Sequence, residues 1–569
     1  MKSKNAVVIV IICSLFCISC QKGTTSISTS SEETSPSSTD IIIPTGLEVN
    51  SSHESGFYDN DFYLTLASDC PDIYYTLDGS EPTVNSTKYN QPIHIYDRSQ
   101  EANKYADLDS LSPLDNYYRP NSPVDKAFVI TYQAIDGEEK GPIYHQHFWI
   151  NKNTYNIKMV SILMDEKDLF DKTRGIYCLG DIYDHTTSEQ RSNPYTCPAN
   201  YNQKGKDWER KANIAIFNGD KTSLLNQDIG IRIQGGWSRA FNQKSLALYA
   251  RKEYSGTNLF DVPLIDEHLH KSYILRSGGY RDSKITKIRD LLNQGLSSDL
   301  GFETQKGEPV QVYLNGEYWG VYNLMEKYSE DYINSYYDIA KKNVEIIECG
   351  AVDEGDEDTL DRYQEMVAFF TNTDLSIASN YTIVNQYLDI DSFINYMVCE
   401  LYIGNIDWPK NNVRWYRSIE AGDKVNEDTK WRMMMYDTDD SDNIPDVGTM
   451  CTYDSDPFLP NNHWAGGPIS DKCDIGNIMI SLMKNASFKE KFVSTATQLA
   501  DSRFTYNDVS NRLNQMKNIY QAPMMKHYQR FVSKDLGETY FNEQVNRIDD
   551  YFKNRKNHFL SYINNYFID

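Results

Sequence analysis

The stretch VQVYLNGEYWGVYNL, residues 310 to 324, most constrains how this chain can fold. Asn315-Gly316 accepts positive φ at both positions of a tight turn, so the alternating residues on either side predict two antiparallel strands. Residues 229 to 249, IGIRIQGGWSRAFNQKSLALY, alternate in the same way around a glycine pair. The middle of the chain therefore predicts hairpins.

Helical periodicity follows these hairpins. Residues 283 to 301 place Ile285, Ile288, Leu292 and Leu296 on one face, with Ser283 as the expected cap and Gly301 as the expected end. Residues 391 to 405 predict a second helix that begins at Asp391. A strand over 430 to 436 delivers Asp437, and the chain from about residue 475 is helical. The pattern predicts an α+β domain with a strand-rich front and a largely helical back.

A separate β-rich region precedes this domain. Residues 42 to 150 contain short alternating runs such as DIYYTLDGSEPT, with Asp78-Gly79 at a turn. Short strands separated by turn residues predict a small antiparallel β-sandwich. Tyrosine rings there could contact carbohydrate, although a structural spacer role is favoured.

The N-terminus predicts export. The segment MKSKNAVVIVIICSLFCISC has two lysines and then an apolar run too short for a comfortable membrane span. We interpret residues 1 to 20 as a lipoprotein-type signal with Cys20 as the lipidated residue, and residues 21 to 41 as a Ser/Thr-rich tether. The alternative is an ordinary signal peptide that is cleaved elsewhere.

Charge and cysteine content restrict the remaining possibilities. The chain has 56 Lys+Arg and 81 Asp+Glu, a net charge of −25 that repels nucleic acid. Beyond the signal, Cys178 and Cys197, and Cys451 and Cys473, are near enough in sequence to form disulfides. None of these cysteines has the CxxC spacing that is typical of a structural zinc site, so such a site is not expected.

Four oxygen-bearing side chains form the strongest candidate site. Asp407 and Asn412 lie five residues apart in GNIDWPKNN, where Pro409 disfavours continuation of the preceding helix. Asp437 and Asp439 follow the strand over 430 to 436. Several carboxylates that lie close together require a neutralising cation. Carboxylate and amide oxygens are hard ligands suited to Mg²⁺. The alternative is a solvated acidic loop.

The glycine pair predicts a phosphate-binding turn. Gly235 and Gly236 could let backbone amides approach phosphates, with Arg239 and Lys244 neutralising the charge. Glu326 could then orient Lys244 through an ion pair. The alternatives are an ordinary hairpin with a surface lysine, and an acid at the start of a helix.

Four ordered stretches resemble one family. GIRIQGGWSRAFNQKSLALY, LNGEYWGVYNLMEKYSEDY, NYMVCELYIGNIDWPKNNVRWY and KWRMMMYDTDDS are similar to the spore coat protein H (CotH) family of atypical protein kinases. The resemblance covers about residues 158 to 530, leaving 531 to 569 as a helical extension. It implies a fold distantly related to protein kinases, and transfer of the ATP γ-phosphoryl group to Ser or Thr of surface or coat proteins with Mg²⁺ or Mn²⁺. Residues 72 to 89 resemble the β-sandwich modules beside chitobiase and hexosaminidase domains.

The resemblance also implies roles for single residues. Lys244 would contact the ATP phosphates with Glu326 as its partner, and Asp407 would be the catalytic-loop acid. Asn412, Asp437 and Asp439 would bind the metal.

The chain departs from the family pattern in one loop. YDTDDSDN lacks the glycine that relatives more often have, which puts the geometry of the metal loop in question. A non-catalytic surface binding or adhesion protein on the same scaffold is therefore the alternative to a lipid-anchored kinase. A carbohydrate-active envelope protein is a third reading, suggested by the N-terminal module.

Overall fold

The computed structural model describes residues 41–114, 118–464 and 466–568. The predicted signal peptide, Cys20 and all but the last residue of the predicted tether lie outside this part of the chain. Within it, no helix is both long enough and apolar enough to cross a membrane.

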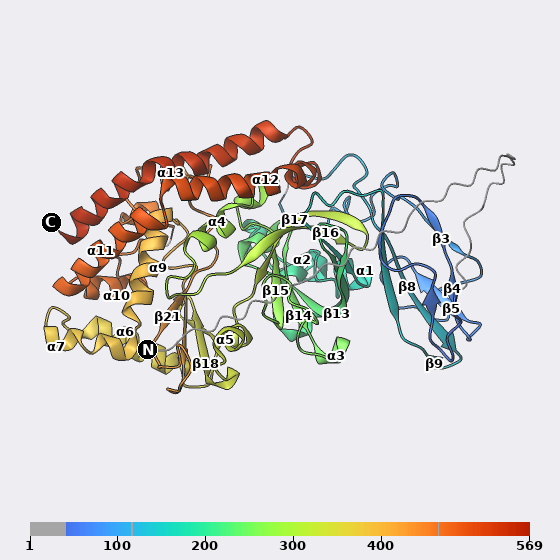
Figure 1. Cartoon of the computed structure of the whole chain (residues 1–569), viewed down its shortest axis with the longest axis horizontal. Coiled ribbons are helices and arrows are strands. Elements are labelled where there is room, and N and C mark those ends of the chain that lie inside the picture. Colours follow the sequence, from blue (N-terminus) through green and yellow to red (C-terminus); the bar gives the residue numbers. More distant parts are fainter. Residues whose placement is uncertain (1–40, 115–117, 465, 569) are drawn as a thin grey trace, which may run out of the picture. The chain divides into compact units, whose positions relative to one another are not determined.

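The N-terminal region is β-rich, as predicted (Figure 1), and side chains from its small sheets form a shared core. Leu64 and Ile95 from one sheet pack with Ile130 and Phe148 from another. Not every pairing is antiparallel, because β2 runs parallel to β10. The strands are β1 (Asn50–Ser51), β2 (Gly56–Tyr58), β3 (Phe62–Leu64), β4 (Leu66–Ala67), β5 (Ile73–Thr76), β6 (Thr87–Lys88), β7 (Ile93–Ile95), β8 (Phe128–Asp136), β9 (Glu139–Lys140) and β10 (Tyr144–Ile150).

The next strands form a closed barrel in the order β11-β12-β13-β14-β15-β17-β16. All neighbours are antiparallel except β11 and β16, whose parallel pairing closes the ladder. Buried aliphatic and aromatic side chains fill it. The strands are β11 (Lys158–Leu163), β12 (Arg210–Phe217), β13 (Ser223–Gln234), β14 (Ser245–Ala250), β15 (Ser272–Arg276), β16 (Gly307–Leu314) and β17 (Glu317–Glu326).

Both predicted hairpins are confirmed. β16 pairs with β17 across Asn315 and Gly316, whose φ angles of 46° and 83° are those a two-residue primed turn requires. β13 pairs with β14, and Gly235 leaves the first strand with a φ of 105°. The loop between them contains a short 3₁₀ turn, Trp237–Ala240.

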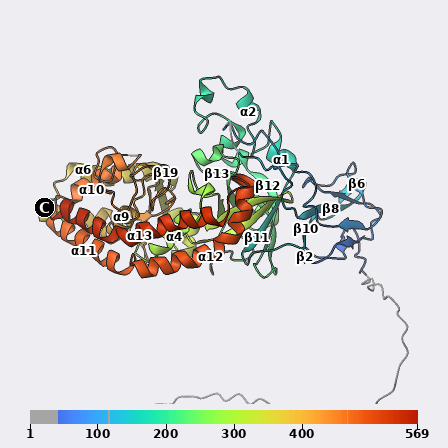
Figure 2. The ribbon, with the colours of Figure 1, turned by 90° about the horizontal axis from the view of Figure 1, so that it is seen from above.

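The chain after β17, together with α4, forms a helical layer with a four-stranded sheet, ordered β19-β18-β20-β21. The predicted C-terminal helices are present, and α12 runs beside α13 in both views (Figures 1 and 2). One large core joins these helices to α9. The elements are β18 (Val344–Glu348), β19 (Ala351–Glu354), β20 (Arg414–Ser418), β21 (Arg432–Met434), α4 (Arg289–Leu296), α5 (Glu330–Tyr337), α6 (Thr359–Asn372), α9 (Ile390–Ile403), α10 (Asp474–Leu482), α11 (Ala486–Ser502), α12 (Tyr506–Phe531) and α13 (Glu538–Phe567).

Two helix starts differ from the predictions. The helix expected over 283 to 301 is only α4, because Lys287 has a positive φ of 60° that interrupts a helical backbone. Ser283 instead lies in a 3₁₀ turn, and Gly301 lies beyond the helix end. In α9 the cap is Asp389, whose carboxylate accepts from the amides of residues 391 and 392, so the choice of Asp391 was wrong by two residues.

The expected disulfides are not formed. Every cysteine in the described part of the chain is a free thiol. Cys178 and Cys197 are buried, and their thiols lie against backbone carbonyls.

Candidate functional site

The loop after α9 closes on itself and presents Asp407. Gly404 ends the helix with a φ of 67°. The side-chain amide of Asn412 donates to both the carbonyl and the carboxylate of Asp407, each at 3.2 Å. Asn411 donates to the other carboxylate oxygen at 2.9 Å. The five-residue spacing therefore brings the predicted acid and amide into direct contact.

The same amide joins this loop to the segment after β21. Asn412 Nδ2 lies 3.4 Å from the carbonyl oxygen of Asp437. Both residues have positive φ, 58° and 56°, a backbone region that residues other than glycine seldom occupy. The structure thus brings together Asp407, Asn412 and Asp437, which come from two segments 25 residues apart.

A buried arginine, which the sequence did not single out, neutralises part of this cluster. Arg276, at the end of β15, bonds Asp437 at 2.5 Å and also contacts Asp439. Its Nε lies 2.9 Å from a carboxylate oxygen of Asp290, in the first turn of α4. Asp290 in turn accepts from the amide and hydroxyl of Thr438 at 3.1 and 2.9 Å. One guanidinium therefore ties the barrel, α4 and the acidic segment together.

Gly279 permits the close approach of this segment. It has a φ of 59°, and a Cβ placed on it would lie 2.3 Å from a carboxylate oxygen of Asp439. Only glycine meets both demands without movement of its neighbours. Gly278 and Gly279, which follow the end of β15, were the signal that could have located this part of the site.

The cluster carries excess negative charge. Burial and the nearby Asp290 and Asp437 raise the pKa of Asp439 well above its ordinary value, against the opposing effect of Arg276. Burial also raises the pKa of Asp407, with Asp437 adding to the shift. Asp440, paired with Arg281 at 2.6 Å, has a pKa raised to about 6 by burial. A cation placed here would relieve this repulsion.

Exposed aromatic rings border the acidic segment. Trp237, in the turn after Gly236, stacks on Tyr195 with ring centres 5.1 Å apart. Arg281, which pairs with Asp440, lies over the rings of Tyr280 and Trp464. Trp237 and Trp464 are both about half exposed.

The basic residues of the glycine turn face inward. Lys244 is completely buried, and its ammonium donates to the carbonyls of Leu111, Arg239 and Phe241 at 2.6 to 2.8 Å. Burial lowers its pKa well below the ordinary value. The guanidinium of Arg239 likewise donates to backbone carbonyls, including those of Gly235 and Ile233.

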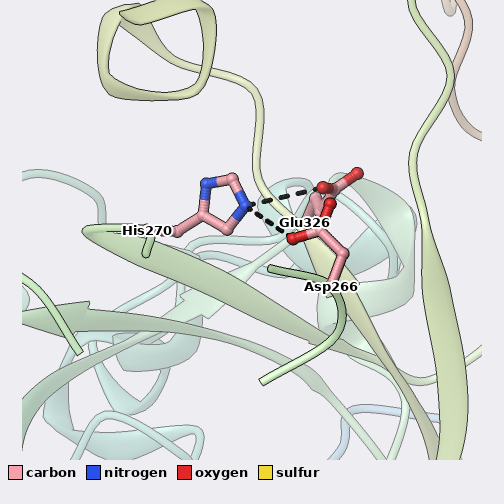
Figure 3. Close-up of side chains that lie close together, drawn as sticks. All are labelled: Asp266, His270 and Glu326. Carbon is pink, nitrogen blue, oxygen red and sulfur yellow. Dashed lines mark ion pairs between the residues drawn. The ribbon is translucent and has the colours of Figure 1, made fainter. Parts of the chain in front are cut away.

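The expected ion pair between Lys244 and Glu326 is not formed. Glu326, at the end of β17, lies instead beside Asp266 and His270 (Figure 3). The ammonium of Lys244 lies over the ring of Tyr201, 4.0 Å from the ring centre. The alternating pattern of the strand could not reveal that Lys244 points inward. Three backbone carbonyls, rather than an acidic side chain, accept its hydrogen bonds, and the strand pattern does not show them.

Comparison with known proteins agrees with the four stretches noted in the sequence. Residues 231–559 match the model of a family described as CotH kinase protein. Residues 53–105 match the chitobiase/beta-hexosaminidase C-terminal domain. The chain is also 24% identical over 224 residues to "Inner spore coat protein H" of Bacillus subtilis (strain 168), a match covering 36% of this chain and 57% of that relative. Since the first family model covers more than half of its residues, this chain belongs to the CotH kinase protein family.

Proposed function

We propose that this protein is a metal-dependent kinase that transfers the ATP γ-phosphoryl group to Ser or Thr of cell-envelope or coat proteins. The observation that carries the proposal is the convergence of Asp407, Asn412 and Asp437 in front of the Arg276–Asp290 pair. Phosphoryl transfer depends on positioned charge more than on covalent chemistry, and this cluster supplies such charge.

The arrangement supports a kinase-like scaffold. Protein kinases pair a basic residue on a strand with an acid on the following helix, and place metal-binding residues after a catalytic loop and after a later strand. Here the strand residue is Arg276 and the helix acid is Asp290. We therefore assign to these two residues the role that the resemblance gave to Lys244 and Glu326. Lys244 and Arg239 would instead hold the glycine turn in shape.

The residues present fit a hard divalent ion. Carboxylate and amide oxygens are the donors that Mg²⁺ and Mn²⁺ prefer, and Asp437 keeps 36% of its side chain exposed. Asp437 and Asn412 would hold the ion, with Asp439 behind them. When bound, the ion would neutralise charge on the phosphates of ATP. Asp407 would accept the proton of the substrate hydroxyl, because its carboxylate is held by Asn411 and Asn412 at the mouth of the loop.

The location follows from two separate arguments. The related spore coat protein suggests a coat- or envelope-associated protein. The N-terminal sequence supports export and a lipid anchor at Cys20, with the β-rich module as a spacer or carbohydrate-contacting element. The acceptor would then be a protein on the same surface.

The test is phosphoryl transfer by the full chain. We expect labelled phosphate to pass from ATP to a panel of Ser- and Thr-containing proteins with Mg²⁺ or Mn²⁺. Asp437→Ala should abolish transfer without changing the circular dichroism spectrum. Asp423→Ala, which removes an exposed aspartate outside the cluster, should retain full activity. If neither wild type nor Asp437→Ala transfers labelled phosphate with any metal or acceptor, the proposal is overturned.

One observation favours a non-catalytic binding protein instead. Arg276 already bridges Asp437 and Asp439, so an internal cation occupies part of the place where a metal would act. A thermal shift assay separates the two functions, because a ligand that binds the folded state raises its melting temperature. A shift with ATP plus Mg²⁺ that Asp437→Ala loses supports the kinase, whereas no shift supports the binding protein.

A further inference from the structure

A second cluster of metal-ligating side chains lies at the end of β17 (Figure 3). It contains Asp266 and His270, from the segment before β15, and Glu326. One ligand atom from each residue lies within 4.8 Å of the other two. All three side chains are at least nine-tenths buried. None of them belongs to the acidic cluster around Asp437.

The hydrogen bonds of His270 leave a lone pair aimed at the two carboxylates. Ser335 donates its single hydroxyl proton to the carbonyl of Tyr332 at 2.8 Å. The contact of 3.4 Å between Ser335 Oγ and His270 Nδ1 therefore has the imidazole as its donor. In the neutral ring Nε2 then carries no proton, and this buried atom has no hydrogen-bond partner.

One of the two distances around Nε2 lies in the range expected between two ligands of one metal ion, and the other is a few tenths of an ångström longer. Nε2 lies 3.5 Å from Glu326 Oε1 and 3.9 Å from Asp266 Oδ1, too far for strong hydrogen bonds. Zinc ligands at about 2.0–2.2 Å in a tetrahedron stand about 3.3–3.6 Å apart. A proton on Nε2 would draw the ring closer, whereas a metal ion would sit between these atoms.

The count of charges points the same way. The hydroxyl of Tyr336 contacts an oxygen of Asp266 at 2.5 Å and also Glu326, but it has one proton for two carboxylates. Lys306 supplies one positive charge, through its ammonium 2.8 Å from Asp266. Two carboxylates beside one ammonium leave an uncompensated negative charge in a buried site, which favours a further cation.

We propose that Asp266, His270 and Glu326 bind a divalent transition-metal ion, with Zn²⁺ as the representative ion. One imidazole and two carboxylates suit Zn²⁺ better than Mg²⁺, which prefers oxygen ligands alone. The 3.4 Å contact between Nδ1–H and Ser335 favours this tautomer, as outer hydrogen bonds do for metal-bound histidines. The ion would join the segment before β15 to the end of β17.

The experiment measures metal retention by the full chain. All proteins in this experiment carry Asp437→Asn, which excludes metal uptake by the acidic cluster. The result therefore does not depend on kinase activity. After stripping, loading with Zn²⁺ and gel filtration, we expect about one equivalent of zinc by mass spectrometry, a ratio set by the one site. His270→Ala should lose it. His268→Ala is the matched control, since His268 reaches Asp266 through its backbone amide, which the substitution keeps, and it should retain the zinc.

A spectrum keeps the proposal falsifiable if His270→Ala does not fold. Co²⁺ bound to the otherwise intact chain should give visible absorption bands of a low-symmetry site, which stoichiometric Zn²⁺ removes. Absence of bands, or equal zinc retention by His270→Ala and its control, would overturn the proposal.

Discussion

At the scale of single residues, Arg276 faces three carboxylates from two distant parts of the chain. Its ion pairs with Asp290, Asp437 and Asp439 are largely buried. Burial alone would lower the pKa of this guanidinium, but the three carboxylates outweigh it and raise the pKa well above its ordinary value. The arginine is therefore permanently charged, and it limits the repulsion within the site.

Arg276→Ala should destabilise the fold by about 3–5 kcal/mol, because it leaves buried carboxylates without their partner. Urea unfolding measures this, and Mg²⁺ should restore part of the loss by replacing the missing charge. Lys424→Ala is the control, since it removes a lysine from an exposed ion pair with Asp338 and should leave the midpoint unchanged. Equal midpoints for both variants would contradict the importance of Arg276.

A matched pair of glycine substitutions tests the close approach at Gly279. Gly279 and Gly301 both have positive φ, so alanine at either position costs about 1–2 kcal/mol in strain. At Gly301 the added Cβ meets open space, whereas at Gly279 it collides with Asp439. We expect Gly279→Ala to lower the melting temperature further and to abolish the thermal shift with ATP and Mg²⁺. Identical behaviour of the two variants would show that Asp439 is free to move aside.

At the scale of elements, α9 sets the position of the loop that holds Asp407. Asp389 caps its first turn and also pairs with Arg432 on β21 at 3.0 Å. Gly404 ends the helix one turn before the loop closes. The helix and the strand that present the two halves of the site are thus fixed to each other.

Asp389→Ala should cost about 1 kcal/mol or slightly more, the usual effect of losing an N-cap. Asp391→Ala should cost much less, because Asp391 is an exposed residue whose carboxylate pairs with Lys491 at the surface. Thermal unfolding of both variants measures the difference. A larger loss at Asp391 would mean that the helix begins where the sequence predicted.

The elements show which parts of the site a single sequence can predict. The hairpins, α9 and the strand before Asp437 follow local periodicity and turn chemistry, and they were predicted. The pairing of Arg276 with Asp437 joins residues 161 positions apart, one at the end of a barrel strand and the other after β21, so no local pattern contains it. The ion pair expected between Lys244 and Glu326 is absent for a related reason: one of the acceptors of Lys244, the carbonyl of Leu111, lies 133 residues away in the sequence. Whether a lysine faces a cleft or the core depends on such distant partners.

At the scale of the whole molecule, a buried acid links side chains at one end of the barrel. Glu209 precedes β12 and accepts from Arg232, Arg251 and Lys206. Burial alone would raise its pKa, but these hydrogen bonds lower it from 4.5 to about 2.

Acid should therefore weaken the fold in a defined window. The unfolded chain binds a proton at Glu209 below about pH 4.5, whereas the folded chain resists protonation until about pH 2. The contribution of Glu209 is complete above this window and is lost as the pH falls through it. Urea unfolding between pH 5 and pH 2, values that bracket this shift, should show a shallower decline for Glu209→Gln than for wild type. Parallel curves would contradict this role.

The closure of the barrel also determines how the molecule can meet other chains. Because the β11–β16 pairing completes the ladder, its strands have no free edge onto which a foreign strand could add. The four-stranded sheet does end at an open strand, β19, whose residues 351 to 353 are exposed. Asp353 places negative charge along that border, so pairing with a foreign strand is discouraged there although the edge is open.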